Sequence, residues 1–436
     1  MDMQFILDIF SSPSTLSFQD IVYISWYFIM FEIFPFLIEL AIMLTWKIKA
    51  QLTKTRWKEA RKELFIKRPF VSILIPGRNE GENFYKLLTS LSEQTYQNFE
   101  IIIVNDGSTD QSELIGRDLE RAGLIDLFIS NGCRGGKASA ANLALRFARG
   151  EYIVHLDADC SFDKDAIENS ILPFFYNSKI GAVGGNILIR NYRENILTAL
   201  QSMEYIHAFS IGRIVASELN IYMIVSGAFG TFRKDILQRF GGWDIGPGLD
   251  GDLTVKIRKL GYRIHFEPSA ICETHVPSTV KGLTRQRLRW DKSLIRFRLR
   301  KHRDIFLPNS AFNIFNFLAL FSDLLLGFAI NFKWLIFVGG IILIFPHSYP
   351  AIFIFQFILY LLLHFIKYLT FYAFRKRKNE SLILNILLLP LMIFYQNWFL
   401  RTIRITAHLK ELFFRSSYKD SWNPAKTSLQ ARKLKI

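Results

Sequence analysis

Residues 100–106 read Glu-Ile-Ile-Ile-Val-Asn-Asp, and residues 152–159 read Tyr-Ile-Val-His-Leu-Asp-Ala-Asp. Each contains a short apolar run that suits one buried strand, and carboxylates follow each run within two residues. A third apolar run covers residues 71–76 and ends in a Pro-Gly turn. Polar segments with the length of helices separate these runs, so the sequence predicts an α/β fold with an open, mostly parallel sheet.

The carboxyl ends of parallel strands meet at one edge of a sheet, and ligands of open α/β sheets bind at that edge. Asp106 follows one predicted strand, and Asp157 and Asp159 follow another. We therefore expect two distant parts of the sequence to converge on one cleft. After residue 160 the expected elements are less regular, namely a helix to about residue 177, a strand at 181–190 and helices at 194–215, 235–240 and 253–260.

Apolar residues are both abundant and segregated along the chain. They make up 50% of the 436 residues and include 41 phenylalanines, which is too many for an ordinary soluble enzyme. Residues 21–45 form an apolar run, interrupted by two glutamates, that is long enough to cross a hydrocarbon core of about 30 Å. The predicted parts are an N-terminal membrane anchor (1–46), a water-soluble domain with interface helices (47–305), a C-terminal transmembrane region (306–400) and a basic tail (401–436).

The formal net charge of +16 is concentrated beside the apolar runs. Lys and Arg far outnumber Asp and Glu in residues 47–68 and 281–303. Basic residues that flank spans follow the positive-inside bias and attract anionic lipid headgroups. This distribution predicts a multi-pass protein of the inner or plasma membrane whose large domain is cytoplasmic. Nucleic acid is not an expected partner, because no C2H2, RRM, KH or helix-turn-helix signature is present.

The cysteines and the N-terminus agree with this location. Cys133, Cys160 and Cys272 fall in the predicted cytoplasmic domain, so we expect free thiols and no disulfide frame. Neither a basic n-region nor a small-residue cleavage site accompanies residues 21–45, which predicts a retained anchor and not a cleaved signal.

The C-terminal apolar region contains four candidate spans, at 311–330, 334–347, 350–373 and 381–399. Four crossings return the basic tail to the cytoplasm, as the charge bias favours, and this is the preferred prediction. They also place Arg375-Lys-Arg-Lys378 outside, which the same bias disfavours. The alternative is that 334–347 does not span and 381–399 lies at the interface.

Acidic residues after strands have a specific chemistry. The pair Asp157 and Asp159 suits Mg2+ or Mn2+, which typically takes one or two protein carboxylates and bridges two phosphates of a nucleotide. A turn or helix-cap role is the alternative for each aspartate. Asp250 lies in a Gly-Pro-Gly-Leu-Asp-Gly-Asp loop, where a carboxylate can deprotonate an attacking hydroxyl, and Asp252 is its rival or a helix cap.

Two further motifs suit phosphates and sugars. Gly135-Gly136-Lys137 opens a small-residue helix, where backbone amides and one ammonium can meet phosphate or sugar oxygens. Residues 286–290 read Gln-Arg-Leu-Arg-Trp and combine guanidinium groups for phosphate with an indole for stacking on a sugar ring. Contact with anionic lipid beside the membrane is the alternative for this basic tract.

Together these residues resemble the processive membrane glycosyltransferases of family 2, which include cellulose, chitin, hyaluronan and poly-β-1,6-N-acetylglucosamine synthases. The resemblance covers about residues 70–300. Its motifs in this sequence are Ile75–Glu80 (IPGRNE), Val104–Asp110 (VNDGSTD), Gly135–Asn142 (GGKASAAN), Asp157-Ala-Asp159, Ser226–Gly230 (SGAFG), Asp250 and Gln286–Trp290 (QRLRW).

The resemblance implies a GT-A fold and an inverting reaction on a UDP-sugar. It implies that Glu80 and Asp106 hold the uridine, that Lys137 and Asp157 contact the nucleotide sugar, and that Asp159 and Asp157 engage a metal–diphosphate. It further implies Asp250 as the general base, Gln286 and Arg289 as diphosphate ligands, and Trp290, Ser226 and Gly227 at the acceptor.

The sequence departs from the family pattern at two places. Leu249 stands where the family usually has Glu before the catalytic Asp, and Asp291-Lys-Ser follows Trp290 where a small residue and a glycine are common. The Ser226–Arg233 stretch and the compact size look most like poly-N-acetylglucosamine synthases.

The expected function is elongation of a polysaccharide from a UDP-sugar at the membrane. The expected partners are the donor, the growing chain, membrane lipids and a small membrane or export subunit. The rivals are a non-processive transferase that adds one sugar to a lipid, and a membrane-anchored electrostatic scaffold without activity.

Overall fold

The computed structural model describes residues 17–244, 248–307, 313–374, 381–419 and 424–434. It divides into two compact units, which are treated separately below. One unit contains Met1–Leu44 and Leu324–Ile405, and the other contains Thr45–Asp323 and Thr406–Ile436. The second unit contains all the predicted site residues.

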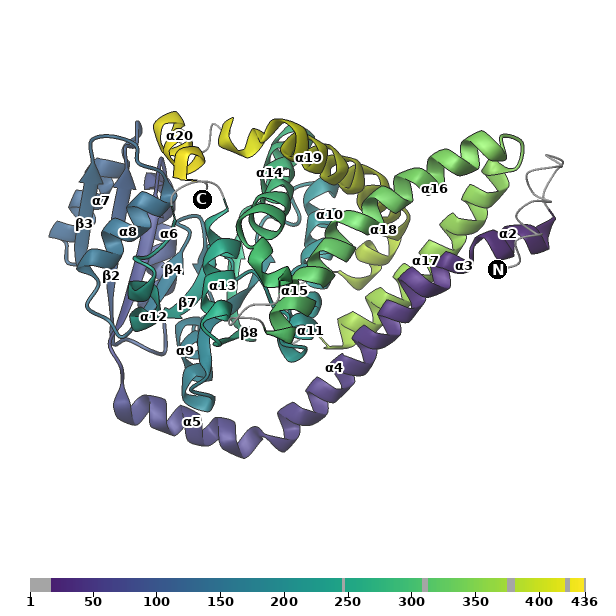
Figure 1. Ribbon diagram of the computed structural model, residues 1–436. Helices are drawn as coiled ribbons and strands as arrows, with labels where there is room; N and C mark the ends of the chain where they lie inside the picture. The colour runs from purple at the N-terminus through teal and green to yellow at the C-terminus, as the bar shows by residue number, and fades with distance from the viewer. Residues whose placement is uncertain (1–16, 245–247, 308–312, 375–380, 420–423, 435–436) are drawn as a thin grey trace. The chain divides into compact units, whose positions relative to one another are not determined.

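A sheet with the strand order β3-β2-β1-β4-β7-β6-β8-β5 forms the centre of the larger unit (Figure 1). β1, β2, β3 and β4 pair in parallel, whereas β7 is antiparallel to both β4 and β6. The strands are β1 (Val71–Gly77), β2 (Phe99–Asp106), β3 (Leu127–Asn131), β4 (Tyr152–Leu156), β5 (Ser161–Phe162), β6 (Ile180–Ile189), β7 (Phe229–Arg233) and β8 (Arg263–Thr274).

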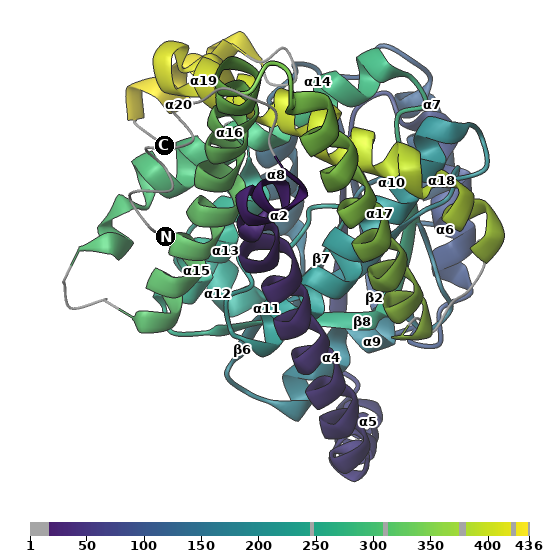
Figure 2. The same ribbon diagram turned by 90° about the vertical axis from the view of Figure 1, so that its right-hand side faces the viewer.

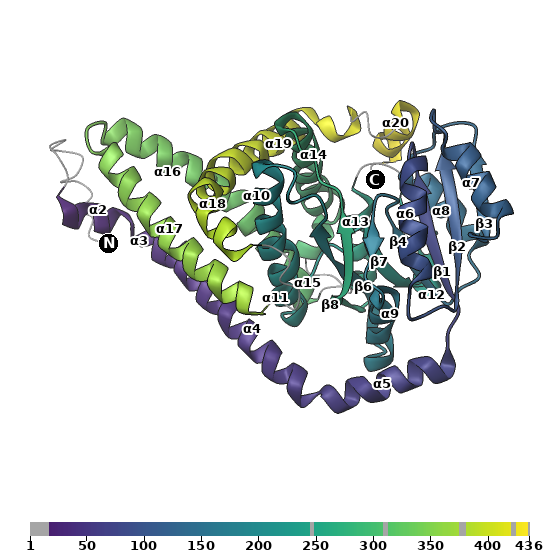
Figure 3. The ribbon, with the colours of Figure 1, turned by 180° about the vertical axis from the view of Figure 1, so that it is seen from behind.

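Helices cover this sheet. In the predicted parallel half they are α6 (Gly81–Ser92), α7 (Ser112–Arg121) and α8 (Lys137–Phe147). The remaining helices of the unit are α5 (Lys54–Lys67), α9 (Ala166–Tyr176), α10 (Ile196–Tyr205), η2 (Ile206–Ile211), α11 (Gly212–Glu218), α12 (Lys234–Arg239), α13 (Leu249–Lys259), α14 (Val280–Ser293), η3 (Leu294–Lys301), η4 (Arg303–Phe306), α15 (Ile314–Leu324), η7 (Ser416–Lys419) and α20 (Ala425–Leu434). Figure 3 shows the same helices from behind.

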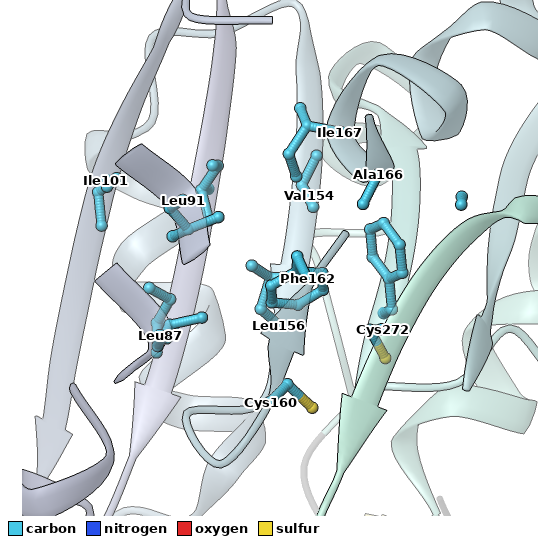
Figure 4. Close-up of a cluster of buried hydrophobic side chains, with 14 of the residues drawn as sticks. Leu87, Leu91, Ile101, Val154, Leu156, Cys160, Phe162, Ala166, Ile167 and Cys272 are labelled. Carbon is cyan, nitrogen blue, oxygen red and sulfur yellow. The ribbon is translucent and has the colours of Figure 1, made fainter. Parts of the chain in front are cut away.

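The main hydrophobic core lies between the sheet and the helices on one of its faces. Figure 4 shows part of it, where Leu87 and Leu91 of α6 face Val154 and Leu156 of β4, with Phe162 beside them. These side chains are almost completely buried. Burial of apolar strands under helices fixes the sheet, so the loops at the strand ends are held in place.

The predicted α/β architecture is confirmed, with two differences. β7 and β8 were not expected, because β7 contains a glycine and β8 contains a proline and several charged residues, which hide the strand pattern. α13 begins at Leu249 and not at Leu253, so Asp250 and Asp252 belong to the first helical turn and not to a loop.

The smaller unit is a set of apolar helices. They are α2 (Phe18–Ile24), α3 (Trp26–Phe28), η1 (Ile29–Ile33), α4 (Phe34–Leu52), η5 (Leu325–Ala329), α16 (Ile330–Ile344), α17 (Tyr349–Phe374), α18 (Leu382–Phe394), η6 (Tyr395–Leu400) and α19 (Arg401–Phe414), the last residues of α4 and α19 belonging to the larger unit. In the described part of the chain, four continuous helices are long and apolar enough to cross a membrane: Ile29–Leu52, Ile314–Ile344, Tyr349–Phe374 and Leu382–Phe414. Figure 2 shows α4 and α17 side by side.

The expected number of C-terminal spans needs correction. Residues 314–344 form one continuous helix, so the predicted spans 311–330 and 334–347 are not two separate crossings. The sequence Ile-Asn-Phe-Lys-Trp at 330–334 contains polar residues but no proline or glycine, and the helix continues through it. Residues 311–312 and 375–378 lie outside the described residues.

Candidate active site

The predicted carboxylates lie at the carboxyl ends of three neighbouring parallel strands. Glu80 follows β1, Asp106 ends β2, and Asp157 follows β4. β1 pairs with β2 on one side and with β4 on the other, so the chain order reverses at β1. Open α/β sheets bind their ligands at this kind of switch point.

Asp106 organises the glycine loop before α8. Its two carboxylate oxygens accept hydrogen bonds from the backbone N–H groups of Gly135 (2.7 Å) and Gly136 (2.8 Å). Gly136 has a φ of +94°, which favours glycine. The carboxylate therefore fixes the turn that presents Lys137 at the start of α8.

Lys137 is the electrostatic centre of the site. Its ammonium is ion-paired with Asp157. Burial alone would lower the pKa of Lys137, but Asp157, Asp250 and Asp159 raise it above its ordinary value. The side chain is therefore a permanent cation among three carboxylates.

Asp159 and Glu80 lie beside this pair. Burial and the neighbouring charge of Asp157 raise the pKa of Asp159. The pKa of Glu80 is raised to about 7, mainly by burial and also by repulsion from Asp159 and Asp157. A hydrogen bond from Asn83 opposes this rise. Crowded carboxylates of this kind are stabilised by an added cation.

Asp250 faces the same cluster from α13. Its Oδ2 accepts a hydrogen bond from the Gly227 N–H at 2.8 Å. Burial raises the pKa of Asp250, and the positive charges of Lys137 and Arg289 and the Gly227 hydrogen bond oppose that rise. A buried carboxylate with a raised pKa is a stronger base than an exposed one.

Gly227 fits only because it has no side chain. A Cβ atom at this position would lie 2.6 Å from Asp250 Oδ1, far below a van der Waals contact. The Gly227 carbonyl in turn lies 2.7 Å from His155 Nδ1. Because a carbonyl oxygen only accepts, His155 donates from Nδ1, and burial lowers the pKa of His155 to about 4, which keeps it neutral. Ser226, next in line, accepts a hydrogen bond from the Ala228 N–H at 3.4 Å.

Asp252, the other acidic residue in the first turn of α13, is surrounded by basic side chains. Its Oδ1 lies 2.8 Å from both Lys301 Nζ and His302 Nε2, and Lys256 Nζ is 3.3 Å from Oδ2. Burial alone would raise the pKa of Asp252, but these donors hold it well below its usual range. The Asp252 carboxylate thus links α13 to the end of η3 through ion pairs. The geometry therefore favours Asp250 over Asp252 as a base.

The pentapeptide 286–290 lies on α14 and splits into two faces. Arg287 is buried and forms a bidentate ion pair with Glu204 of α10, at 2.7 and 2.8 Å. It is therefore not a phosphate ligand, contrary to the expectation of two available guanidinium groups. Arg289 remains partly exposed, and its charge reaches Asp250.

Gln286 and Trp290 are also only partly buried. The Oε1 atom of Gln286 is buried and has no hydrogen-bond partner in the described part of the chain. The Trp290 ring meets Phe209 edge to face, with ring centroids 6.1 Å apart, and the Arg287 guanidinium lies 4.8 Å from its centroid. The indole is thus held in a fixed orientation between α14 and η2.

Sequence reasoning missed two residues that shape this site, His155 and Glu204. His155 lies two residues before Asp157 inside a buried strand, and a polar residue in such a strand is a recognisable signal. Glu204 carries no such signal, because its partner Arg287 is 83 positions away in the sequence.

Part of the sequence matches a protein-family model. Residues 72–241 match the family model described as Glycosyl transferase family 2. The chain therefore carries a family 2 glycosyltransferase domain, and its mixed α/β sheet is of the GT-A type.

Two curated relatives with the same enzyme name are similar to part of this chain. The chain is 38% identical over 227 residues to a poly-beta-1,6-N-acetyl-D-glucosamine synthase of Staphylococcus epidermidis, covering 50% of this chain and 53% of the relative. It is 37% identical over 225 residues to the enzyme of the same name from Staphylococcus aureus, with the same coverage. The chain thus spans about half the length of the curated relatives that it matches.

One solved structure resembles most of the chain. It is the mannosyltransferase PcManGT from Pyrobaculum calidifontis, in complex with GDP-Man and Mn2+. The TM-score is 0.54 at 20% sequence identity, and the match covers 86% of this chain and 99% of the other. At this identity the likeness concerns the fold.

Proposed function

We propose that this protein is an inverting, processive β-glycosyltransferase that elongates a polysaccharide from a UDP-sugar at the membrane. UDP-N-acetylglucosamine is the favoured donor, and a poly-β-1,6-N-acetylglucosamine-like chain is the favoured product. The single observation that carries the proposal is that Asp157, Asp159 and Asp250 gather around Lys137, while the charge of Arg289 acts on Asp250. The staphylococcal relatives, named as synthases of this polymer, support the choice of sugar.

The donor is assigned to the sheet edge and α14. Glu80 and Asp106 hold the uridine, and Lys137 and Asp157 contact the nucleotide sugar. Gln286 and Arg289 hold the diphosphate. Gln286 Oε1 is a buried acceptor without a partner among the described residues, and a hydroxyl of the bound sugar would satisfy it, whereas the side-chain NH2 is the group that can donate to the diphosphate.

A divalent cation, Mg2+ or Mn2+, fits Asp159 and Asp157. No group of three potential ligands is found among the described residues. Mg2+, however, usually needs only one or two carboxylates together with substrate phosphates. The raised pKa of Asp159 beside Asp157 is the sign of unbalanced negative charge that such a cation offsets. When bound, it neutralises the charge of the departing diphosphate.

The transfer step needs a base and a platform. Asp250 accepts the proton of the acceptor hydroxyl as its oxygen attacks the anomeric carbon. The bond from that carbon to the diphosphate breaks on the opposite face, so the configuration inverts and UDP leaves. Trp290 stacks on the acceptor sugar, and Ser226 and Gly227 line its site. Arg289 and Lys137 stabilise the developing charge.

We place the domain on the cytoplasmic side of the cell membrane, because UDP-sugars are cytoplasmic and the basic flanks at 47–68 and 281–303 favour that side. Membrane lipids contact these flanks. A small membrane or export subunit is a further proposed partner.

The function is tested with purified protein in liposomes and a panel of UDP-glucose, UDP-N-acetylglucosamine and UDP-glucuronate. We expect UDP release with one donor, above all UDP-N-acetylglucosamine, and a high-mass product on a gel when that sugar is radiolabelled. A labelled product of low mass that partitions into organic solvent would show a non-processive transferase acting on lipid instead. No UDP release with any donor would leave the scaffold alternative.

A further inference from the structure

We propose that Lys301 is a positioning residue for the transfer step, because it fixes the turn of α13 that carries the proposed base, Asp250. Lys301 is the last residue of η3, which continues directly from α14. It acts through Asp252 and not through a contact with substrate. The inference rests on the proposed function, since it concerns the base of that reaction.

Two acidic side chains from different elements share the Lys301 ammonium. One is Asp252 of α13, whose Oδ1 lies 2.8 Å from Nζ, and the other is Asp244, in the segment that follows α12. Lys256 joins the same two carboxylates from α13, at 2.7 Å from Asp244 and 3.3 Å from Asp252. Two carboxylates at this separation repel each other unless cations lie between them. Removal of one ammonium should therefore push the first turn of α13 away from Asp244.

The Asp252 contact determines how the first turn of α13 is rotated. Successive residues of an α-helix are about 100° apart, so residues two positions apart point in nearly opposite directions. Asp250 Oδ2 accepts from the Gly227 N–H at 2.8 Å, whereas Asp252 faces Lys301. A rotation of this turn that breaks the ion pair with Lys301 therefore moves Asp250 away from Gly227.

The backbone of the same turn packs closely on η3. Gly248, with a φ of +86°, is so near to Phe297 that a Cβ there would lie 2.1 Å from a ring carbon. A Cβ at Gly251 would lie 3.4 Å from Arg298 Nη1. η3 is a π-helix, a rare form that is frequent at functional sites. The packing thus sets the distance between the turn and η3, while the ion pairs of Lys301 set its rotation.

Asp244 is a fixed anchor for this contact. The preceding Trp243 donates its N–H to Asn142 Oδ1 of α8 at 2.8 Å, and its carbonyl accepts from Asn142 Nδ2 at 2.7 Å. α8 begins at Lys137, to which a donor contact is assigned above. Lys301 thus ties the base helix both to the end of the α14–η3 helix and to a segment that is held by α8.

Lys301→Met tests this role, because it removes the charge and keeps most of the bulk. In liposomes we expect kcat for UDP release to fall about 10- to 100-fold, as for a displacement of the base by about 1 Å. The bonds between Trp243 and Asn142 remain, so KM for UDP-N-acetylglucosamine should stay within about threefold of its original value. Lys301→Arg keeps the cation and should recover most of the loss. Asp252→Asn keeps an oxygen that can accept from Lys301, and it should keep its kcat.

Lys259→Met is the matched control. Lys259 also belongs to α13 and pairs with Asp304 at 2.7 Å, but it lies at the far end of the helix from Asp250. This variant should lose an ion pair and keep its kcat. Melting temperatures in detergent show which variants fold, and Lys256→Met, which removes the other shared ammonium, takes the place of Lys301→Met if that variant does not fold.

Two results would overturn the proposal. One is a kcat in folded Lys301→Met or Lys256→Met that equals that of Lys259→Met. The other is a folded Lys301→Arg that is as slow as Lys301→Met. Absence of UDP release by the unchanged protein would instead refute the proposed function, and this inference with it.

Discussion

At the scale of single residues, Gly227 determines where the Asp250 carboxylate lies. Its N–H donates to Asp250 Oδ2, and its carbonyl is held by His155. The proposed base is therefore positioned by a backbone segment.

Gly227→Ala tests this arrangement. The new methyl group would lie 2.6 Å from Asp250 Oδ1, so either the carboxylate or the backbone must move. A displacement of about 1 Å is enough to cost roughly 100-fold in kcat. The measurement is UDP release at saturating donor. Gly132→Ala is the control, because a Cβ there meets nothing within 4 Å. Similar kcat values in the two variants would show that Gly227 does not position the base.

Glu80 gives the site a pH dependence near neutrality. Its pKa is raised to about 7, so the charged form accumulates as the pH rises through that value. If the charged form binds the donor, kcat/KM for the UDP-sugar rises with pH across the same range and levels off above it. Glu80→Gln should remove this limb of the profile. An unchanged limb in the variant would assign the titration to another group.

At the scale of elements, α14 separates a buried, ion-paired side chain from partly exposed ones. Arg287 faces Glu204 in a buried pair, whereas Gln286, Arg289 and Trp290 are partly exposed. The same division holds on α13, where Asp252 is tied to Lys301 and His302 while Asp250 faces the site.

The pair of Arg287 and Glu204 is tested by comparing a single variant with a double variant. Arg287→Met leaves a buried carboxylate without its partner and should destabilise the protein by about 3–5 kcal/mol. Adding Glu204→Leu removes that uncompensated charge and should recover most of the loss. The melting temperatures of the purified variants in detergent provide the comparison. If the double variant is as unstable as Arg287→Met, the stability lost does not come from an unpaired Glu204.

Some of these elements follow from local sequence, and others do not. β1, β2 and β4 are continuous apolar runs, so the strands and the carboxylates at their ends were predictable from the sequence alone. The pattern of β8 was not, because this strand contains Pro268 and partly buried charged residues. The sequence also did not show that Arg287 is buried while Arg289 is partly exposed, since this difference depends on contacts with residues far away in the chain.

At the scale of the whole molecule, the direction of the helices restricts the membrane topology. Ring contacts join Phe28 of α3 to Tyr360 and Phe36 of α4 to Phe371, so the segment from α3 through α4 runs parallel to α17. The C-terminal segment contacts the sheet domain of the same unit, where Arg300 pairs with Glu411 at 2.7 Å and the Thr427 hydroxyl donates to the Gly135 carbonyl. The tail therefore lies on the same side as the domain.

This arrangement predicts an even number of C-terminal crossings. We expect Ile314–Ile344 and Tyr349–Phe374 to cross and Leu382–Phe414 to lie along the membrane surface, since it includes polar residues and is the most buried of the four candidates. The membrane-impermeant labelling of single cysteines tests this topology after Cys133 is replaced. Ser17→Cys should react only from outside, and Lys433→Cys only from inside. Labelling of both from the same side would contradict the predicted topology.

The most direct test of the central claim is the turnover of Asp250→Asn, measured beside Asp252→Asn in the same liposomes. If Asp250 is the base of a processive transferase, Asp250→Asn binds UDP normally but forms polymer at least about 1,000-fold more slowly, as expected for loss of a general base. Asp252→Asn should retain turnover in whatever fraction folds. Polymer formation by Asp250→Asn at an undiminished rate would contradict the mechanism proposed for this site.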